Sequence, residues 1–412
     1  MIWTRVNLRI ILGKNPENSL IGGGFEILIF KLPKQELQCN NLKIKMKPQK
    51  PYLSGLEFDP FLLATPEAYP NDDEASNSFV IQLKLPRSFV ITSEPKVATF
   101  REDTGTWVSD GCKVEEFNPR NYFISISITK IARFGIFQDV QINMPYNSWS
   151  LRSLGRSRSL LLKMPEKIMG SLESSQSPML QSDKIGLSNA NFISTLGNKE
   201  TNQVLFTLNG KCIRLKFYIV NERVCLLPLY STDPIYLEEE VPVDNEWLSS
   251  LFWRWFTPNE MNQVMTYCGI NIFPDDKFIK EKSKKKSLKL EKLFYDQISV
   301  VTQEYSFQSS RWERSNSDKE SCIFNIAEYK GIKEVDESDW KLVSMTGNNL
   351  INLNTSEFDE TFEKPLVDQT KQNLLQKVFK ENGTSKISSF NFDVATYETL
   401  RKILINTRVF QH

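Results

Sequence analysis

The sequence predicts an α+β fold in three parts: an antiparallel β-sandwich-like domain, a Ser-rich linker, and a mixed β-sheet plus helices domain that ends in C-terminal helices. Three observations predict it. Apolar and polar residues alternate over residues 1–151, and this alternation is lost over 152–202. In the remainder, a hairpin pattern is followed by segments with helical spacing of apolar residues, one of which begins with a capping motif. We expect an α+β domain over 203–355 and a helical segment over 356–412.

The first domain is predicted from runs with β-branched or aromatic residues at near period two. In Tyr122–Lys130, residues Ile124, Ile126 and Ile128 share one face and hydroxyl residues take the other, which is typical of a half-buried antiparallel strand. Gly22–Gly24 is interpreted as a turn, because no Lys-Ser/Thr pair follows it as a phosphate loop requires. The other predicted strands are Trp3–Leu12, Phe25–Leu32, Phe79–Leu85, Val97–Arg101 and Ile131–Val140.

Residues 152–202 are rich in Ser, Leu, Lys, Asn and Gln, as in SLGRSRS and SLESSQS, and nearly lack aromatic residues. Such a composition cannot bury enough apolar area to offset the entropy lost on ordering. We therefore expect a flexible linker or insertion between two domains.

The second domain opens with a hairpin pattern, Asn209-Gly210 between the apolar runs Val204–Leu208 and Ile213–Val220, and a third strand is expected at Val224–Leu229. Three residues then predict a helix start: Thr257 as N-cap, Pro258 at the first helical position and Glu260 completing a capping box. Further helices predicted from apolar stripes span 288–304, 374–379 and 397–404.

The residue inventory predicts no enzyme, no cofactor and no metal site. The single histidine is His412, so neither a Ser-His-Asp triad nor a His metal site can be built in a core. The acidic runs Asp72–Glu74 and Glu238–Glu240 lie beside prolines and are interpreted as solvated loops. The six cysteines include no CxxC pair, and we expect them to be reduced and cytoplasmic.

Overall charge and hydropathy argue against nucleic-acid and membrane partners. Fifty-one Lys and Arg against fifty Asp and Glu give a net charge of +1, so there is no global basic field. No apolar run reaches the roughly 18 residues that a membrane span needs, and no signal-peptide pattern opens the sequence.

Two clusters are candidate partner-binding sites. A lysine cluster is either a solvated loop or a contact for an acidic surface such as the acidic tails of tubulin, and it lacks the aromatic residues of a single-strand nucleic-acid binder. Trp253 and Trp255, near Trp247, are either core between helix and sheet or partner anchors. The lysines of the cluster are Lys280, Lys282, Lys284, Lys285 and Lys286.

Two longer stretches resemble a known family. The first joins Trp107–Gly111 to Phe134–Leu151, and the second runs from Thr257 through Gly269–Pro274 to Phe307–Trp312. Together they are similar to the family named for cancer susceptibility candidate one, the axonemal dynein intermediate chains associated with the two-headed inner arm. The resemblance extends over about residues 79–404.

The resemblance implies a non-catalytic structural subunit of the ciliary or flagellar axoneme, whose partners are axonemal dynein subunits and the tubulin of the microtubule doublet. The alternative is a cytoplasmic assembly factor or adaptor for dynein arms. The family usually carries a long charged helical region before the β domain, whereas this sequence begins almost directly with a predicted strand. Within the matching stretches, we expect Trp149 and Trp312 to be buried core anchors and Gly135 to mark close backbone approach or a bulge in a strand.

Limited proteolysis should cut first within 152–202, because that segment has no apolar periodicity to hold it in a core. Mass spectrometry of the early fragments would locate the cuts. A single resistant fragment spanning the segment would contradict the two-domain prediction.

Overall fold

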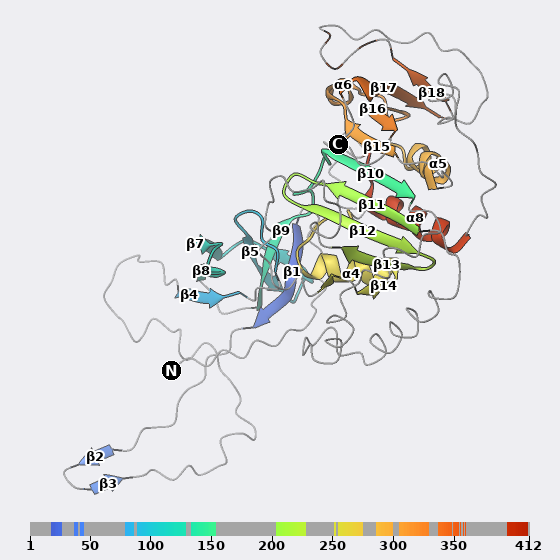
Figure 1. Cartoon of the computed structure of the whole chain (residues 1–412). Coiled ribbons are helices and arrows are strands. Elements are labelled where there is room, and N and C mark those ends of the chain that lie inside the picture. Colours follow the sequence, from blue (N-terminus) through green and yellow to red (C-terminus); the bar gives the residue numbers. More distant parts are fainter. Residues whose placement is uncertain are drawn as a thin grey trace. The chain divides into compact units, whose positions relative to one another are not determined.

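The α+β prediction is confirmed, and the chain divides into two compact units, Met1–Gln138 and Asp139–His412 (Figure 1). Residues 148–151, which the sequence assigned to the first domain, belong to strand Ser148–Ser153, which pairs within the sheet of the second unit. The computed structural model describes residues 18–26, 37–39, 42–44, 79–85, 89–128, 133–153, 203–227, 251–252, 254–274, 286–299, 305–328, 337–347, 349–353, 355, 357, 359 and 394–410. The predicted linker, apart from its first two residues, and the predicted helix 374–379 therefore lie outside the described residues.

Within its described residues, the first unit contains three sheets. As predicted, Ile124, Ile126 and Ile128 are buried, but Ser125 between them is buried as well. The four-stranded sheet has the order β1 (Asn18–Glu26), β9 (Arg133–Asp139), β5 (Lys96–Arg101), β6 (Thr106–Val108); the three-stranded sheet has the order β4 (Phe79–Lys84), β8 (Phe123–Ile128), β7 (Cys112–Asn118); and β2 (Leu37–Cys39) pairs with β3 (Leu42–Ile44).

Glycines in this unit make room for large neighbours. A Cβ on Gly135 would lie 2.4 Å from Leu20 Cδ1, so it is a neighbouring side chain, and not backbone, that approaches this glycine closely. The interpretation of Gly22–Gly24 as a turn is wrong, because all three residues lie inside β1. Gly22 adopts a positive φ of 68°, and a Cβ there would meet the ring of Phe89 at 1.9 Å. The glycine therefore seats an aromatic ring against a strand.

The second unit is built on a nine-stranded sheet whose neighbouring strands are all antiparallel. The predicted hairpin is present, with Asn209 opposite Arg214 and residues 210–213 as its loop. The strand order is β14 (Trp255–Phe256), β13 (Arg223–Leu227), β12 (Arg214–Val220), β11 (Gln203–Asn209), β10 (Ser148–Ser153), β15 (Tyr305–Ser309), β16 (Ser321–Glu328), β17 (Lys341–Thr346) and β18 (Asn349–Asn352).

The helices begin largely where the sequence predicts them. The capping box is confirmed, since Thr257 Oγ1 accepts from the Glu260 N–H at 3.3 Å and Glu260 Oε2 accepts from the Thr257 N–H at 2.7 Å. Of the helix predicted over 288–304, the structure describes Leu288–Ser299 as helix, and residues 300–304 lie outside the described residues. The helical segments of the described residues are α4 (Pro258–Tyr267), α5 (Leu288–Ser299), α6 (Arg311–Ser315), η4 (Glu337–Asp339) and α8 (Val394–Thr407).

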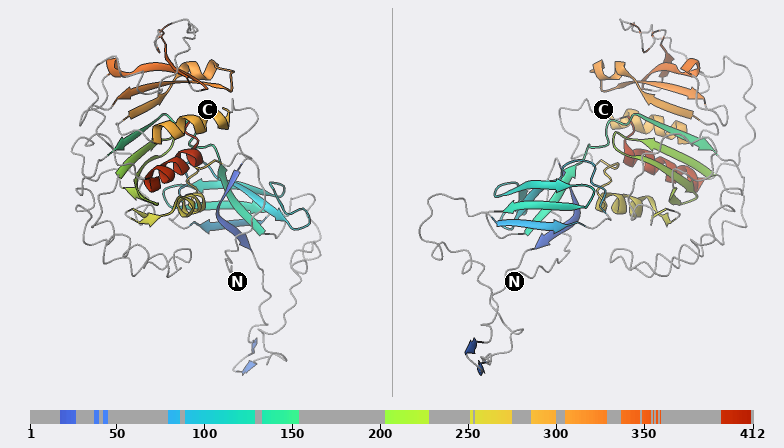
Figure 2. Two further views of the ribbon diagram at one scale, coloured as in Figure 1. Left: turned by 90° about the vertical axis from the view of Figure 1, so that its right-hand side faces the viewer. Right: turned by 60° about the vertical axis from the view of Figure 1, so that its left-hand side comes forward.

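Helices α5 and α8 lie side by side on one face of the nine-stranded sheet (Figure 2). An aromatic layer fills the space between the helices and the sheet. Trp149 of β10 stacks on Phe307 of β15 with ring centroids 3.7 Å apart, and Phe410, just after α8, contacts Trp149, Phe294 of α5 and Phe324 of β16. The prediction that Trp149 is a core anchor is thereby confirmed, at 4% exposure.

Trp312 is not the fully buried anchor that the sequence predicted. Its indole is only partly buried against Ile323, Leu342 and Leu353, and the guanidinium of Arg311 lies 4.4 Å from its ring centroid. Trp312 is partly exposed because of the face of the sheet that it covers. Phe324 and Val343 face the aromatic layer, whereas Ile323 and Leu342, which Trp312 contacts, lie on the other face of the sheet.

Trp149→Ala should lower the free energy of unfolding by about 4 kcal/mol, the usual cost of removing a large buried aromatic side chain. Trp312→Ala should cost about 1 kcal/mol, because a partly exposed ring leaves a smaller cavity. Chemical denaturation of the two variants measures both values. Equal losses would show that Trp312 contributes to the core as much as Trp149 does.

Candidate functional site

The described residues contain no cluster of three His, Cys, Asp or Glu side chains that could hold a metal ion. Among the helices of the described ranges, none is long and apolar enough to cross a membrane. The search for a site therefore turns to the two clusters that the sequence singled out as partner-binding candidates.

The structure separates the members of these clusters. Lys280, Lys282, Lys284, Lys285 and Trp253 lie outside the described residues, and their partner roles stay predictions. Lys286 and Trp255 are described, and each is only 1% exposed. Trp255 lies on β14 opposite Cys225, with its ring 5.6 Å from that of Tyr218. The core alternative therefore describes Trp255 in this fold, and Lys286 does not belong to a solvated loop.

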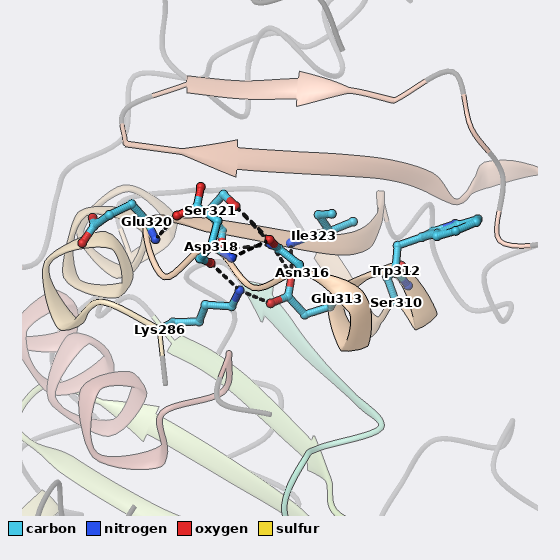
Figure 3. A network of polar contacts seen from close by, with 9 residues as sticks. All are labelled: Lys286, Ser310, Trp312, Glu313, Asn316, Asp318, Glu320, Ser321 and Ile323. Atoms are coloured by element: carbon cyan, nitrogen blue, oxygen red, sulfur yellow. Dashed lines mark hydrogen bonds and ion pairs between the residues drawn. The ribbon is translucent and has the colours of Figure 1, made fainter. Parts of the chain in front are cut away.

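Lys286 is part of a buried network of polar contacts (Figure 3). Its ammonium group forms an ion pair with Glu313 of α6 and donates to the backbone carbonyl of Asp318 at 2.9 Å. The Glu313 carboxylate also accepts from the Ile323 N–H at 2.6 Å and from Asn316 Nδ2 at 3.2 Å. Both charges therefore have several partners, as buried ions require.

Local structure explains how Glu313 reaches this position. Ser310 caps α6 by accepting from the Trp312 N–H at 3.1 Å, and the Asn316 side chain then accepts from the Asp318 N–H at 3.0 Å in the following turn. These two caps turn the short helix back onto β16. Burial raises the pKa of Glu313, while the contacts from Lys286, Ile323 and Asn316 act in the opposite direction.

A second buried ion pair lies nearby. Arg408, after α8, pairs with Glu291 of α5, and the two side chains are 3% and 1% exposed. Cys322 of β16 is close to both pairs: burial is the main reason that its pKa is raised, and Glu313, Lys286 and Glu291 all act on it electrostatically. The two ion pairs thus form one polar centre beside the aromatic layer. Lys286, two residues before α5, pairs with Glu313 of α6, which also accepts from β16, and Glu291 of α5 pairs with the C-terminal segment.

Sequence reasoning missed Glu313, Glu291 and Arg408. Glu291 carried a usable signal, because it lies three residues before Phe294 and next to Leu290 on the apolar stripe of α5, where an acid needs a buried partner. Glu313 and Arg408 carried none, since their partners lie 27 and 117 residues away in the chain.

The two stretches that carry the family resemblance meet in the second unit. Asn143 donates to the carbonyl of Asn271 at 3.2 Å, and Asn271 donates to that of Asp139 at 2.9 Å. The Tyr146 hydroxyl donates to the carbonyl of Ile272 at 2.9 Å. These residues are therefore architectural, because they fasten the segment before β10 to the segment after α4.

Comparison with known proteins gives a consistent result at low identity. No protein-family model matches the chain. The sequence is 22% identical over 409 residues, 95% of the chain, to dynein axonemal intermediate chain 7 from Homo sapiens, and 22% identical over 354 residues, 82% of the chain, to that from Danio rerio. It is 23% identical over 287 residues to a dynein axonemal intermediate chain 7 homolog from Ciona intestinalis.

The chain is similar to dynein axonemal intermediate chain 7. This similarity supports the dynein intermediate chain resemblance that the sequence motifs predicted. The chain spans less than half of these curated relatives, 47% of the human protein, 40% of the Danio rerio protein and 31% of the Ciona intestinalis protein.

Lys286→Met should lower the free energy of unfolding by about 3 kcal/mol, because it leaves the Glu313 carboxylate buried without its counter-ion. The double variant Lys286→Met/Glu313→Gln should lose less than the sum of the two single variants, since Gln still accepts from the Ile323 N–H. A double-mutant cycle by chemical denaturation measures this coupling. Lys289→Met, at an exposed position three residues on, is the matched control and should change stability by less than about 0.5 kcal/mol. Equal effects at positions 286 and 289 would contradict the buried pair.

Proposed function

We propose that this chain is a non-catalytic structural subunit of the ciliary or flagellar axoneme, associated with inner-arm dynein and with microtubules. One observation carries the proposal: the similarity to dynein axonemal intermediate chain 7 extends over 95% of the chain. A shared short motif would leave most of the chain unmatched. A match of this extent involves both compact units.

The described structure supports a role in holding other proteins. The buried ionic side chains Lys286, Glu313, Glu291 and Arg408 are paired with one another across elements of the fold. Such pairs specify which segments pack together, and they leave no buried ionic group poised for proton transfer in this polar centre. The sole histidine at residue 412 is consistent with a protein that binds and does not catalyse.

For the microtubule contact, we propose the lysines just before Lys286, namely Lys280, Lys282, Lys284 and Lys285. Lys286 is buried and paired, so it anchors the end of this cluster and does not itself meet a partner. The acidic tails of tubulin are the proposed partner, because four positive charges in six residues favour a flexible polyanion. Trp253 stays a candidate partner anchor.

Fractionation of isolated axonemes tests the proposed function. A resident subunit should remain with detergent-extracted axonemes and should leave them together with the inner dynein arms at high salt, because such assemblies are held partly by screened charge contacts. Immunoblots of the detergent-soluble, salt-soluble and residual fractions provide the measurement, with outer-arm and inner-arm chains as internal references. Recovery in the detergent-soluble fraction alone would instead favour a cytoplasmic assembly factor or adaptor for dynein arms.

A further inference from the structure

The three-stranded sheet of the first unit ends on one side in strand β4, which pairs with β8 and with no other described strand (Figure 1). On the inward face of β4, Ile81 and Leu83 are only partly buried. Ile126 and Ile124, which lie opposite them on β8, are completely buried. This difference is expected for side chains that have a neighbouring strand on one side only. On the other face of β4, Val80 is 60% exposed.

One hydrogen bond gives the direction of the backbone groups at this edge. The N–H of Leu85, the residue after β4, donates to the carbonyl of Tyr122 at 2.7 Å, in the same register as the β4–β8 pair. In an antiparallel pair, residues that bond to the neighbouring strand alternate with residues whose N–H and C=O point away from it. The pairing of β4 runs without a register shift, so Val80, Gln82 and Lys84 direct their N–H and C=O groups away from β8.

The other edge strands of the described sheets are interrupted, charged or short. Strand β7, on the opposite side of the same sheet, has a register shift between Val114 and Glu116 and carries three charged residues. Strand β1 contains Gly22 at positive φ. Strands β2, β3 and β6 have three residues each, β14 has two and β18 has four. Proteins use such devices to prevent the addition of a further strand. Strand β4 has six residues, no register shift and a charge only at its last residue, Lys84.

We propose that β4 pairs with β4 of a second copy of this chain, so that two three-stranded sheets become one continuous sheet. An antiparallel pairing with Gln82 opposite Gln82 on the two-fold axis uses the outward-pointing backbone groups of Val80, Gln82 and Lys84. In this register Ile81 lies opposite Leu83, which extends the apolar inward face across the two copies. Val80 lies opposite Lys84, so no like charges face each other.

Three properties favour a second copy as the occupant. The strand is complementary to itself in this register on both of its faces. The net charge of +1 opposes the association of two copies only weakly. A two-fold pair also covers the β4 edge of both copies, so that association through this edge ends at a dimer. The inference goes beyond the proposed function and does not rest on it, because it concerns the purified chain in solution.

Sedimentation velocity of the full chain tests the proposal at concentrations up to about 100 μM, because one strand pair gives a small interface. The parent chain should show a concentration-dependent equilibrium between monomer and dimer. Gln82→Lys should weaken dimerisation at least about tenfold, because it places two ammonium groups opposite each other at the two-fold axis. Gln82→Glu should do the same with two carboxylates. An equimolar mixture of these two variants should restore the dimer, because Lys then faces Glu.

The matched control is Glu116→Gln on the opposite edge of the sheet, which changes the net charge by the same amount as Gln82→Lys. Glu116 and Gln82 are both exposed, and both lie opposite Ser125 of β8. The control should dimerise within about twofold of the parent, because it leaves β4 intact. Restoration by mixing also shows that both Gln82 variants are folded, since unfolded chains would not pair.

Three outcomes would overturn the proposal. A parent chain that stays monomeric over the whole concentration range would leave this edge to an extended segment of a different protein. A dimer that tolerates both Gln82→Lys and Gln82→Glu would place the contact between the copies elsewhere. Weakened variants that stay monomeric when mixed would show that residue 82 does not face its own copy across a two-fold axis.

Discussion

The second unit depends on the aromatic layer between its central strands and its two long helices. Trp149 and Phe307 come from strands that are adjacent in the sheet but 158 residues apart in the chain, and their stacking fixes β10 next to β15. Phe410 then closes the layer from the C-terminal side. Buried aromatic area of this size dominates core energetics. The pairing of β10 with β15 and the positions of α5 and α8 on the sheet therefore depend on this one contact region.

Beside that layer, the fold buries four charges as two ion pairs. Burying charge is costly, and an apolar replacement is often as stable, so the pairs are best understood as a device for specificity. Lys286 can be buried only where Glu313 and the Asp318 carbonyl both contact its ammonium group. Arg408 can be buried only where Glu291 provides a counter-ion. Each pair thus disfavours other packing arrangements of the two segments that it joins. Apolar packing alone would tolerate such alternative arrangements.

The same division of charge bears on how the protein meets partners. The sequence places Lys286 in a run of similar residues, yet the fold removes it from the surface and leaves Lys289, Lys292 and Lys402 exposed. The proposed tubulin contact therefore depends on Lys280, Lys282, Lys284 and Lys285 and not on Lys286.

The sequence by itself determined what depends on neighbouring residues. The Thr257–Glu260 capping box, the Asn209-Gly210 hairpin and the isoleucine face of β8 are set by contacts within a few residues or by strand alternation. Only the tertiary structure decided whether Lys286 and Trp312 are buried and whether Gly22–Gly24 form a turn or part of a strand. Lys286 is buried because Glu313 arrives from α6, Trp312 stays partly exposed because of the side of the sheet that it covers, and Gly22 lies in a strand because Phe89 packs on it. Local patterns specify the shape of an element, whereas burial depends on which distant segments pack against it.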